Sequence, residues 1–480
     1  MPKGKSLGVL KHFRGEGLRS RALRGTGITL GGTTGQQLMR LASNLILTRL
    51  LFPEVFGLMA LVQTFMVGLQ MFSDIGIRPS IVQSNRGEDP VFLNTAWTIQ
   101  VGRGFLLWLG ACALAWPLAV FYNESQILWL LPVVGLNAVI QGFSTTKSAV
   151  ASRQLRLGRQ TSIGLMSQAV GIVAMVGLAW IWPSVWALVI GGLISSLFNV
   201  VALHRLMPGV ANRFHWNGDA ARELMNFGRF IFLSTLVGFF VNQGDRLVLG
   251  KLVSFADLGI YNIGFFMATV PTMLGQRVAQ SVLFPLYRQV RPSESEQNMK
   301  KIRRARNLVT GSMIAMFGVL AVVGVLLIDL LYDPRYAAAG PMLVLIALTS
   351  LFDALMIGNG QLLLAEGNSR DFSRLVIIKG LCKFVYMLTG FWLFGIFGLI
   401  VVQGILIALT IYPLQQYYLS KHSGTDLPRD ALFALLGVLV CILAIWVNWD
   451  SVSQFYAASR AASPSVTGNW SPTAVFGHDG

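Results

Sequence analysis

GGTTGQQLMRLASNLILTRLLFPEVFG, residues 31–57, reads as a membrane-spanning helix, yet it carries Arg40 near its middle. Gln36, Arg40, Asn44 and Thr48 recur every four residues, so on a helix they form one polar stripe. A charge near the centre of a bilayer costs about 2.5–3.5 kcal/mol on insertion scales. We therefore expect this stripe to face water or protein inside a bundle of helices.

The composition of the whole chain indicates a polytopic membrane protein. Of the 480 residues, 54% are hydrophobic and 12% are charged, and the mean hydropathy is +0.60. A soluble domain carries about 25% charged residues. Long apolar stretches recur along the whole chain, so the predicted class is an all-α integral membrane protein.

Cysteine and histidine usage indicates no metal site, disulfide framework or cofactor. Cys112, Cys382 and Cys441 lie in apolar runs without C-x-x-C spacing, and no H-E-x-x-H motif occurs among the five histidines. The basic segment 1–24 is followed by a first span without a small-residue cleavage site. We expect that span to stay in place as a signal anchor.

Thirteen segments have the length and apolar character of membrane spans, because about 20 helical residues cross the hydrocarbon core. The predicted spans are 27–50, 55–77, 94–117, 126–146, 160–182, 184–203, 224–244, 258–284, 307–331, 337–361, 374–394, 396–418 and 431–449.

Lysine and arginine residues orient these spans. With a cytoplasmic amino terminus, most of the 38 Lys and Arg residues fall in the tail and in loops on the cytoplasmic side. Arg246, Lys251, Arg335 and Arg460 fall on the opposite side. This bias predicts a cytoplasmic amino terminus. It also explains most of the net charge of +17 without nucleic-acid binding. The basic loop 288–307 is expected to lie on anionic lipid headgroups.

A weak internal repeat relates the two halves of the chain. LTRLLFPEVFGLM (47–59) aligns with LGKLVSFADLGIY (249–261), which pairs Arg49 with Lys251 and Gly57 with Gly259. The alignment places the first span on the seventh, so both copies enter the membrane in the same direction. This arrangement predicts two parallel six-helix bundles with a substrate site between them.

The expected organisation follows from the spans and the repeat. It comprises a basic cytoplasmic tail (1–24), an amino-terminal six-helix lobe (25–206), a cytoplasmic linker (207–223), a carboxy-terminal six-helix lobe (224–420), one extra transmembrane helix (421–449) and a polar, disordered tail (450–480).

Several spans carry polar residues that lipid would penalise, and cations outnumber anions among them. Arginine matches phosphate through its planar fork, and amides suit hydroxyl-rich sugars, so the predicted ligand is a phosphate-bearing anion. The predicted substrate-binding residues are Gln36, Arg40, Asn44, Arg49, Gln100, Arg103, Gln276, Arg277, Gln280, Lys379 and Lys383, and the predicted ion-coupling residues are Asp74, Asp245 and Asp353.

For some of these residues a structural role is an equal alternative. Lys379 and Arg49 lie close enough to span ends to snorkel to the interface. Asp74 could be a feature of a helix end or an ion-pair partner. Asp353 lies deepest, where burial favours proton binding, but a permanent ion pair with Lys379 or Arg277 would explain it equally well.

Two segments resemble a known family. SNLILTRLLFPEVFGLMALVQTF and FSDIGIRPSIVQ, within 43–83, and NQGDRLVLGKLVSFADLGIYNIGFFMATVPTMLGQRVAQSVLFPLYRQ (242–289) are similar to the signatures of polysaccharide flippases. These flippases form the polysaccharide transporter branch of the MOP superfamily. The resemblance covers residues 25–420, and its motifs identify the branch better than the substrate.

The resemblance implies a V-shaped pair of six-helix lobes around a cationic cavity, in a bacterial inner membrane. Family members move undecaprenyl-diphosphate-linked oligosaccharide repeat units from the cytoplasmic to the periplasmic leaflet. It implies that the diphosphate pairs with cavity arginines while the lipid tail remains in the membrane. Polysaccharide polymerases and glycosyltransferases are the implied partners.

Rival classes fit less well. A major-facilitator symporter should carry a basic G-x-x-x-D-[RK]-x-G-[RK] loop after its second span, and QSNRGEDPVFLN (83–94) does not match it. A multidrug exporter of cations should have an acidic cavity. A membrane glycosyltransferase, polymerase or ligase should show a D-x-D pair or a large outer loop, so we expect the protein not to be an enzyme.

Overall fold

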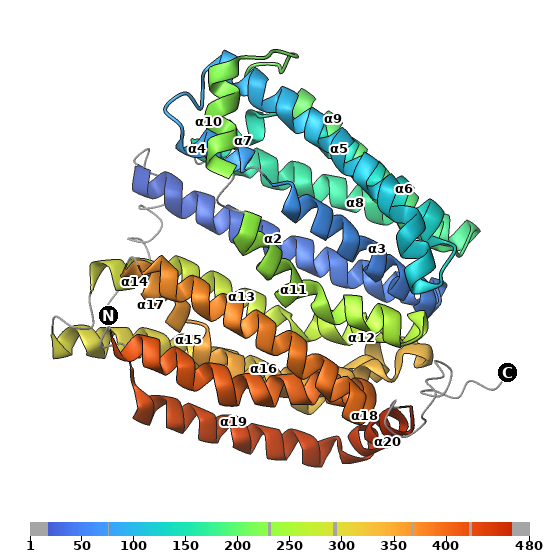
Figure 1. Cartoon of the computed structure of the whole chain (residues 1–480), viewed down its shortest axis with the longest axis vertical. Coiled ribbons are helices and arrows are strands. Elements are labelled where there is room, and N and C mark those ends of the chain that lie inside the picture. Colours follow the sequence, from blue (N-terminus) through green and yellow to red (C-terminus); the bar gives the residue numbers. More distant parts are fainter. Residues whose placement is uncertain are drawn as a thin grey trace, which may run out of the picture. The chain divides into compact units, whose positions relative to one another are not determined.

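The computed structural model describes residues 18–74, 76–154, 156–228, 232–290, 295–366, 368–421 and 425–462. Within these ranges every regular element is a helix (Figure 1), which confirms the all-α prediction. The chain divides into two compact units. One holds the residues up to Leu51 together with Val62–Leu236, and the second holds Phe52–Leu61 together with the chain from Val237 onward. The first turns of the second span thus belong to the second unit.

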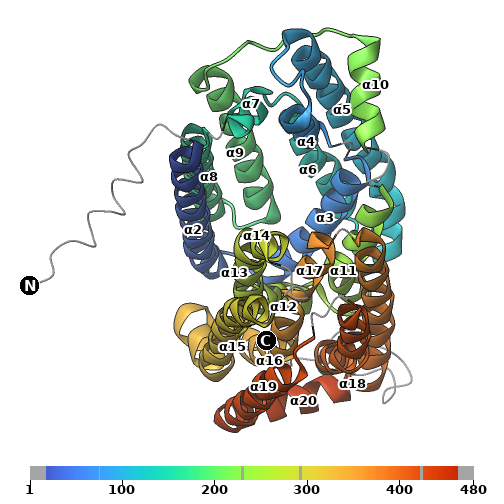
Figure 2. The same cartoon turned by 90° about the vertical axis from the view of Figure 1, so that its left-hand side faces the viewer.

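Six long helices build the first unit. They are α2 (Leu18–Leu50), the later turns of α3 (Pro53–Phe72), α5 (Pro90–Tyr122), α6 (Ile127–Gly142), α8 (Gly158–Ile181) and α9 (Val185–Leu206). α5 packs along α6, α8 along α9, and α2 along α8 (Figure 2). The approach of α5 to α6 depends on glycine, because a Cβ on Gly104 would lie 2.7 Å from the carbonyl oxygen of Ala138.

Three short helices gather at one end of this unit: α4 (Ile77–Gln83), α7 (Lys147–Arg153) and α10 (Gly218–Gly228). Ile81, Phe92 and Leu224 form part of the buried core beneath them. The Ser84 hydroxyl donates to Glu223 over 2.6 Å and ties the end of α4 to α10. All three helices come from segments placed in the cytoplasm by the basic residues. Their meeting at one end agrees with the predicted alternation of the spans.

The second unit contains the helices of the second half of the chain. They are α11 (Phe232–Leu252), α12 (Phe255–Ala268), α13 (Val270–Val278), the π-helical turn η1 (Ala279–Leu283), α14 (Phe284–Gln289), α15 (Glu296–Leu331), α16 (Ala339–Met356), α17 (Asn359–Ala365), α18 (Ser369–Ser420), α19 (Leu427–Val447) and α20 (Trp449–Ala461). α16 lies at the centre of this unit and packs against α12, α15, α18 and α19. Its residues are almost all buried.

Helix α18 contains two predicted spans joined by a sharp break. Phe394 and Gly395 have non-helical backbone angles, and Gly395 has a φ of 62°, in the left-handed region that favours glycine. The Ser459 hydroxyl of α20 donates to the carbonyl oxygen of Phe394 over 2.7 Å and accepts from the Phe397 amide over 2.9 Å. The side chain of Ser459 therefore satisfies backbone groups that the break leaves without helical partners.

The expected disorder of 450–480 is wrong for its first part. Residues Trp449–Ala461 form helix α20, which buries Val452, Phe455 and Ser459. The rings of Phe397 and Tyr456 lie 5.0 Å apart, centre to centre. These apolar residues return to the same helix face every three or four positions, a pattern that the high overall polarity of the segment obscures. Residues 463–480 lie outside the described ranges.

The two glycines paired by the internal repeat are in direct contact inside the second unit. A Cβ on Gly57 would lie 1.8 Å from the carbonyl oxygen of Phe255, and one on Gly259 would lie 2.0 Å from that of Pro53. Pro53 and Phe255 occupy equivalent positions in the repeat. The contact is therefore reciprocal between these two equivalent segments of the repeat.

The thirteen predicted spans overlap helices, but the bounds predicted for 224–244 are wrong: this range begins in α10 and ends inside α11, which continues to Leu252. Fewer helices satisfy a strict test of length and hydropathy. Among the described residues nine helices are long and apolar enough to cross a membrane, or ten if the bent pair α6 and α7 is one span. α18 counts once in this test although it holds two spans. α2 and α11 do not pass, because their polar residues lower the hydropathy. The number of crossings stays a prediction.

Candidate substrate-binding cavity

A polar cavity of about 390 Å³ lies inside the second unit, between α13, η1, α16, α17 and α18. Four of the residues predicted for substrate binding or ion coupling line it: Gln276, Gln280, Asp353 and Lys379. The other lining residues are Thr272, Met356, Ile357, Gly360, Gln361, Phe372, Leu375, Val376, Ile411 and Gln415.

The amide side of the cavity comes from a single helical face. Thr272, Gln276 and Gln280 are spaced four residues apart, and all three line the cavity, as expected for positions that share one face of a helix. The helix changes to a π-turn at Ala279–Leu283. Such turns insert an extra residue into a helix and are frequent at functional sites.

The charged side of the cavity is an ion pair. The Nζ atom of Lys379 lies 2.7 Å from Oδ1 of Asp353, and the two side chains are 32% and 43% exposed. This contact is the ion pair with Lys379 that the sequence left as an alternative for Asp353. It places the Lys379 amino group beside a carboxylate of the cavity lining, while the roles of both residues stay predictions.

A second polar cluster surrounds α11. Lys383 donates to the carbonyl oxygen of Val241 over 2.7 Å, and buried Asp245 accepts a hydrogen bond from Tyr261 over 2.8 Å. Oδ1 of Asp245 is buried and has no hydrogen-bond partner among the described residues. Neither Lys383 nor Asp245 lines the polar cavity, and neither does Arg277, which is half-buried on α13. The ion-coupling role of Asp245 stays a prediction.

In the first unit, Arg103 and Asp74 meet at the end of α3. Arg103 donates to the carbonyl oxygen of Gln70 over 2.8 Å and to the Ser73 hydroxyl over 3.0 Å. Its Nη1 atom lies 3.8 Å from Oδ1 of Asp74, which also accepts from the Gly76 amide. Asp74 is thus both a feature of the helix end and an ion-pair partner. Arg103 satisfies carbonyl groups that the helix end exposes.

Gln100 also donates hydrogen bonds to backbone carbonyl groups at a helix end. Its amide nitrogen donates to the carbonyl oxygens of Gln141, Gly142 and Ser144, at 3.3, 3.0 and 2.9 Å. These are the last carbonyls of α6 and its connection, which have no helical partners of their own. The Gln100 amide is therefore occupied by the protein, and its predicted role in substrate binding has no support from this geometry.

The polar stripe of α2 does not act as one surface. Thr48 is fully buried, and its hydroxyl donates to the carbonyl oxygen of Asn44 over 2.9 Å. The backbone carbonyl of Gln36 accepts from Gln168 of α8 over 2.9 Å. Arg40 and Arg49 are exposed, whereas Gln36 and Asn44 are half-buried. The predicted substrate contacts of these residues stay predictions.

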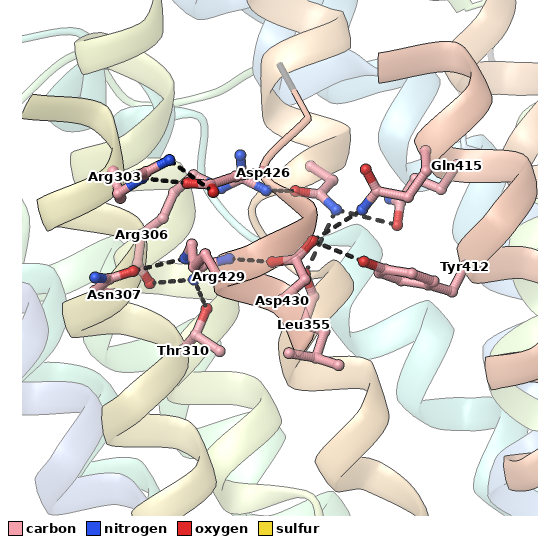
Figure 3. Close-up of polar contacts among 12 residues, drawn as sticks. Arg303, Arg306, Asn307, Thr310, Leu355, Tyr412, Gln415, Asp426, Arg429 and Asp430 are labelled. Carbon is pink, nitrogen blue, oxygen red and sulfur yellow. Dashed lines mark hydrogen bonds and ion pairs between the residues drawn. The ribbon is translucent and has the colours of Figure 1, made fainter. Parts of the chain in front are cut away.

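The sequence analysis missed a buried polar network next to the cavity (Figure 3). Arg429, at the start of α19, donates to the Arg306 carbonyl and to the Asn307 and Thr310 side chains, and it forms an ion pair with Asp430. Asp430 accepts from Tyr412 and Gln416, both over 2.9 Å, and Arg303 pairs with Asp426. The network joins the ends of α15, α18 and α19.

One branch of the network reaches the cavity wall. Arg306 donates to Oδ1 of Asn359, and Nδ2 of Asn359 donates to Oε1 of Gln415 over 3.4 Å. Gln415 lines the cavity. The signal in the sequence was the adjacent pair Gln415 and Gln416 inside a predominantly apolar span. A pair of amides there would be costly in lipid and indicates partners inside the bundle.

A second cavity, of about 630 Å³, lies between α16, α18, α19 and α20. Its lining is mainly apolar and includes Phe352, Phe397, Ile445 and Trp449. The two cavities of this unit therefore differ: side chains that can form hydrogen bonds line the first, and mainly apolar side chains line the second. The polar cavity is the better candidate for a hydrophilic ligand.

The long apolar helices indicate a polytopic membrane protein, and the partly open polar cavity lies among the helices of its second unit. The inward-closed lipid II flippase MurJ has a TM-score of 0.64 at 11% identity, covering 88% of this chain and 99% of that chain. An inward-facing multidrug resistance MATE family transporter of the MOP superfamily has a TM-score of 0.59 at 14% identity, covering 82% and 96%. These similarities establish the fold.

Residues 46–341 match the family model described as "Polysaccharide biosynthesis protein". The match covers more than half of the chain, so this chain belongs to that family. The finding confirms the resemblance drawn from residues 43–83 and 242–289.

Curated relatives agree with the family. The succinoglycan biosynthesis transport protein ExoT of Rhizobium meliloti (strain 1021) is 23% identical over 68% of this chain and 65% of its own length. The teichuronic acid biosynthesis protein TuaB of Bacillus subtilis (strain 168) is 22% identical, over 67% of each. The lipopolysaccharide biosynthesis protein WzxC of Escherichia coli (strain K12) is 21% identical over 67% and 65%. The chain thus spans about two thirds of the length of these relatives.

Proposed function

We propose that this protein is a flippase for lipid-linked oligosaccharides. It would move undecaprenyl-diphosphate-linked repeat units from the cytoplasmic to the periplasmic leaflet of a bacterial inner membrane, for exopolysaccharide, O-antigen or capsule synthesis. The observation that carries the proposal is the polar cavity of about 390 Å³, inside an apolar helical unit of a polysaccharide biosynthesis family. A hydrophilic head group needs polar surroundings inside the protein to cross the hydrocarbon core, because transferring its polar groups into lipid without hydrogen bonds is costly.

The proposed transport separates the parts of the cargo by chemistry. Intramembrane cations such as Arg40 and Arg277 attract the diphosphate, for which arginine is geometrically suited. Sugars enter water-filled, amide-lined space, and the polyprenyl chain stays in lipid, where no transfer cost arises. Arg40→Gln is then expected to lower export without lowering the amount of protein in the membrane, and Arg40→Lys to restore part of it.

Transport without bond-making fits the site better than an enzyme does. The carboxylate in the polar cavity, Asp353, is held by Lys379. The same pairing disfavours a multidrug exporter of cations, because Asp353 presents no uncompensated negative charge. Polymerases and glycosyltransferases are the proposed partners, before and after transport.

Deletion of the gene tests the proposal directly. Undecaprenyl-diphosphate-linked repeat units are expected to accumulate on the cytoplasmic side of the deletion strain, while polymer at the cell surface is lost. A plasmid copy of the full chain should reverse both effects. Loss of polymer without accumulation of complete repeat units would contradict a flippase and would favour a role in synthesis of the repeat unit.

A further inference from the structure

We propose that the polar cavity of the second unit binds uncharged sugar residues of the cargo, and that the diphosphate binds outside it. This inference rests on the proposed flippase function and adds which part of the substrate the cavity holds. It also removes Lys379 from the phosphate-binding residues predicted from the sequence.

The charged side chains in the cavity lining disfavour the binding of a phosphate. Lys379 and Asp353 are the charged side chains in its lining, and they are 2.7 Å apart. Because these opposite charges are adjacent, their fields largely cancel at the position of a ligand in the cavity. A phosphate near Lys379 would also approach the Asp353 carboxylate, and these like charges repel each other. An uncharged ligand meets no such penalty.

The remaining polar groups match hydroxyl groups. Gln276, Gln280, Gln361 and Gln415 each offer an amide that both donates and accepts, and Thr272 adds a hydroxyl. A sugar hydroxyl also donates and accepts, so several amides around one space can satisfy neighbouring hydroxyls.

An aromatic ring completes the lining. A Cβ added to Gly360 would lie 3.0 Å from Cε2 of Phe372, so the glycine leaves room for this ring at the cavity wall. The C–H faces of sugars commonly pack on such rings. Amides around an aromatic ring are therefore a lining suited to a carbohydrate.

The size of the cavity fits a part of the repeat unit. About 390 Å³ lies at the small end of the roughly 300–1,000 Å³ typical of ligand pockets. This volume suits one or two sugar residues and not a whole repeat unit. The cavity can therefore discriminate between cargoes by the sugars that enter it.

The buried network fixes the direction of one amide in the wall (Figure 3). Arginine has donors only, so Arg306 forces Asn359 to present its oxygen to it and its nitrogen to Gln415. Gln415 must then accept from Asn359 with its oxygen, and its NH₂ group points to the Met356 carbonyl, 3.4 Å away. This group has a second N–H, which is left for an acceptor in the cavity. Arg306 and Asn359 thus act as positioning residues.

The test compares two lipids on the full-length protein in nanodiscs. One lipid is undecaprenyl diphosphate without sugar, and the second is the same lipid carrying the repeat unit that accumulates in the deletion strain. Their dissociation constants are measured from intrinsic tryptophan fluorescence. The dissociation constant of the sugarless lipid divided by that of the glycosylated lipid measures the contribution of the sugars to binding. Both lipids share the diphosphate and the polyprenyl chain, so this ratio excludes their contributions.

The wild type is expected to bind the glycosylated lipid more tightly. Gln280→Ala and Gln361→Ala should each lower the ratio by about two- to tenfold, the effect of one hydrogen bond, with the affinity for the sugarless lipid unchanged. Gln289→Ala is the matched control, since Gln289 is exposed on α14 and does not line the cavity. It should keep the wild-type ratio.

Asn359→Asp tests the positioning residues separately. The carboxylate still accepts from Arg306 but has no N–H for Gln415, so the Gln415 amide loses its fixed direction. The ratio should again fall by about two- to tenfold, while the melting temperature and the affinity for the sugarless lipid hold. An unchanged ratio would overturn the role of Asn359.

The outcomes separate this inference from the proposed function. Equal binding of both lipids by the wild type would contradict the sugar site but not the proposed flippase function. Equal weakening of both lipids by Gln280→Ala and Gln361→Ala would assign the cavity to the diphosphate. Failure of the wild type to bind either lipid would overturn the flippase and the sugar site together.

Discussion

Asp353 and Lys379 form the charged contact of the polar cavity, and both side chains remain partly exposed. Solvent-exposed ion pairs contribute about 0–1 kcal/mol to stability, so a large contribution of this pair to folding is not expected. A carboxylate that exchanges its lysine for a proton could link transport to a proton gradient. An ion pair that only neutralises charge inside the cavity would not link transport to a proton gradient.

Neutralising the pair in two steps distinguishes these roles. Asp353→Asn is expected to slow transport in proteoliposomes and to reduce its dependence on an imposed proton gradient. The variant that combines Asp353→Asn with Lys379→Gln should recover most of the rate, because no charge is left uncompensated, without recovering the gradient dependence. Full gradient dependence in Asp353→Asn would show that Asp353 is not the coupling group.

Arg429 carries a second residue-scale prediction. It is 6% exposed and holds Asp430, which is 1% exposed. Removing one partner of a buried ion pair costs about 3–5 kcal/mol, because the other charge stays buried without compensation. Arg429→Met should therefore lower the apparent melting temperature in detergent strongly. Arg304→Met, an exposed arginine of α15, is the control. Equal effects of the two substitutions would contradict the role of the network.

At the scale of elements, α3 and α12 cross at a pair of glycines that leave no room for side chains. A Cβ on Gly57 would meet the backbone of Phe255, which cannot move away as a flexible side chain could. The two helices can therefore be this close only while both positions stay glycine. The crossing also explains why the first turns of α3 belong to the second unit.

Gly57→Ala is expected to separate α3 from α12 and to destabilise the protein by about 1–3 kcal/mol, as overpacking usually does. Thermal unfolding followed by tryptophan fluorescence measures the change. Gly102→Ala is the matched control, because nothing lies within 4 Å of its added Cβ. That substitution should be neutral or stabilising by up to about 1 kcal/mol, since alanine favours the helix. A wild-type melting curve for Gly57→Ala would contradict the close crossing.

At the scale of the whole molecule, the orientation in the membrane is the main prediction. Cysteine at exposed Gln297, near the start of α15, should be cytoplasmic and closed to an impermeant thiol reagent in intact cells. Cysteine at exposed Ser125, between α5 and α6, should react. Both variants are made in a background without Cys112, Cys382 and Cys441. Labelling of Gln297→Cys but not of Ser125→Cys would reverse the orientation.

The sequence by itself determined the membrane class, the approximate positions of most long helices and the family. These properties are local and additive: about 20 apolar residues are enough to define a span wherever they occur. The four-residue spacing of Thr272, Gln276 and Gln280 is local in the same way, because residues four apart lie close together on one face of an α-helix.

Only the tertiary structure decided which polar residues form a site. Arg103 and Gln100 looked like ligand-binding residues, but they bond the helix ends of α3 and α6, whose free carbonyls lie far away in the chain. Gln415 became a cavity residue through Asn359 and Arg306 on other helices. A buried polar side chain must find a partner, and which partner it finds depends on how the helices pack, which local sequence does not encode.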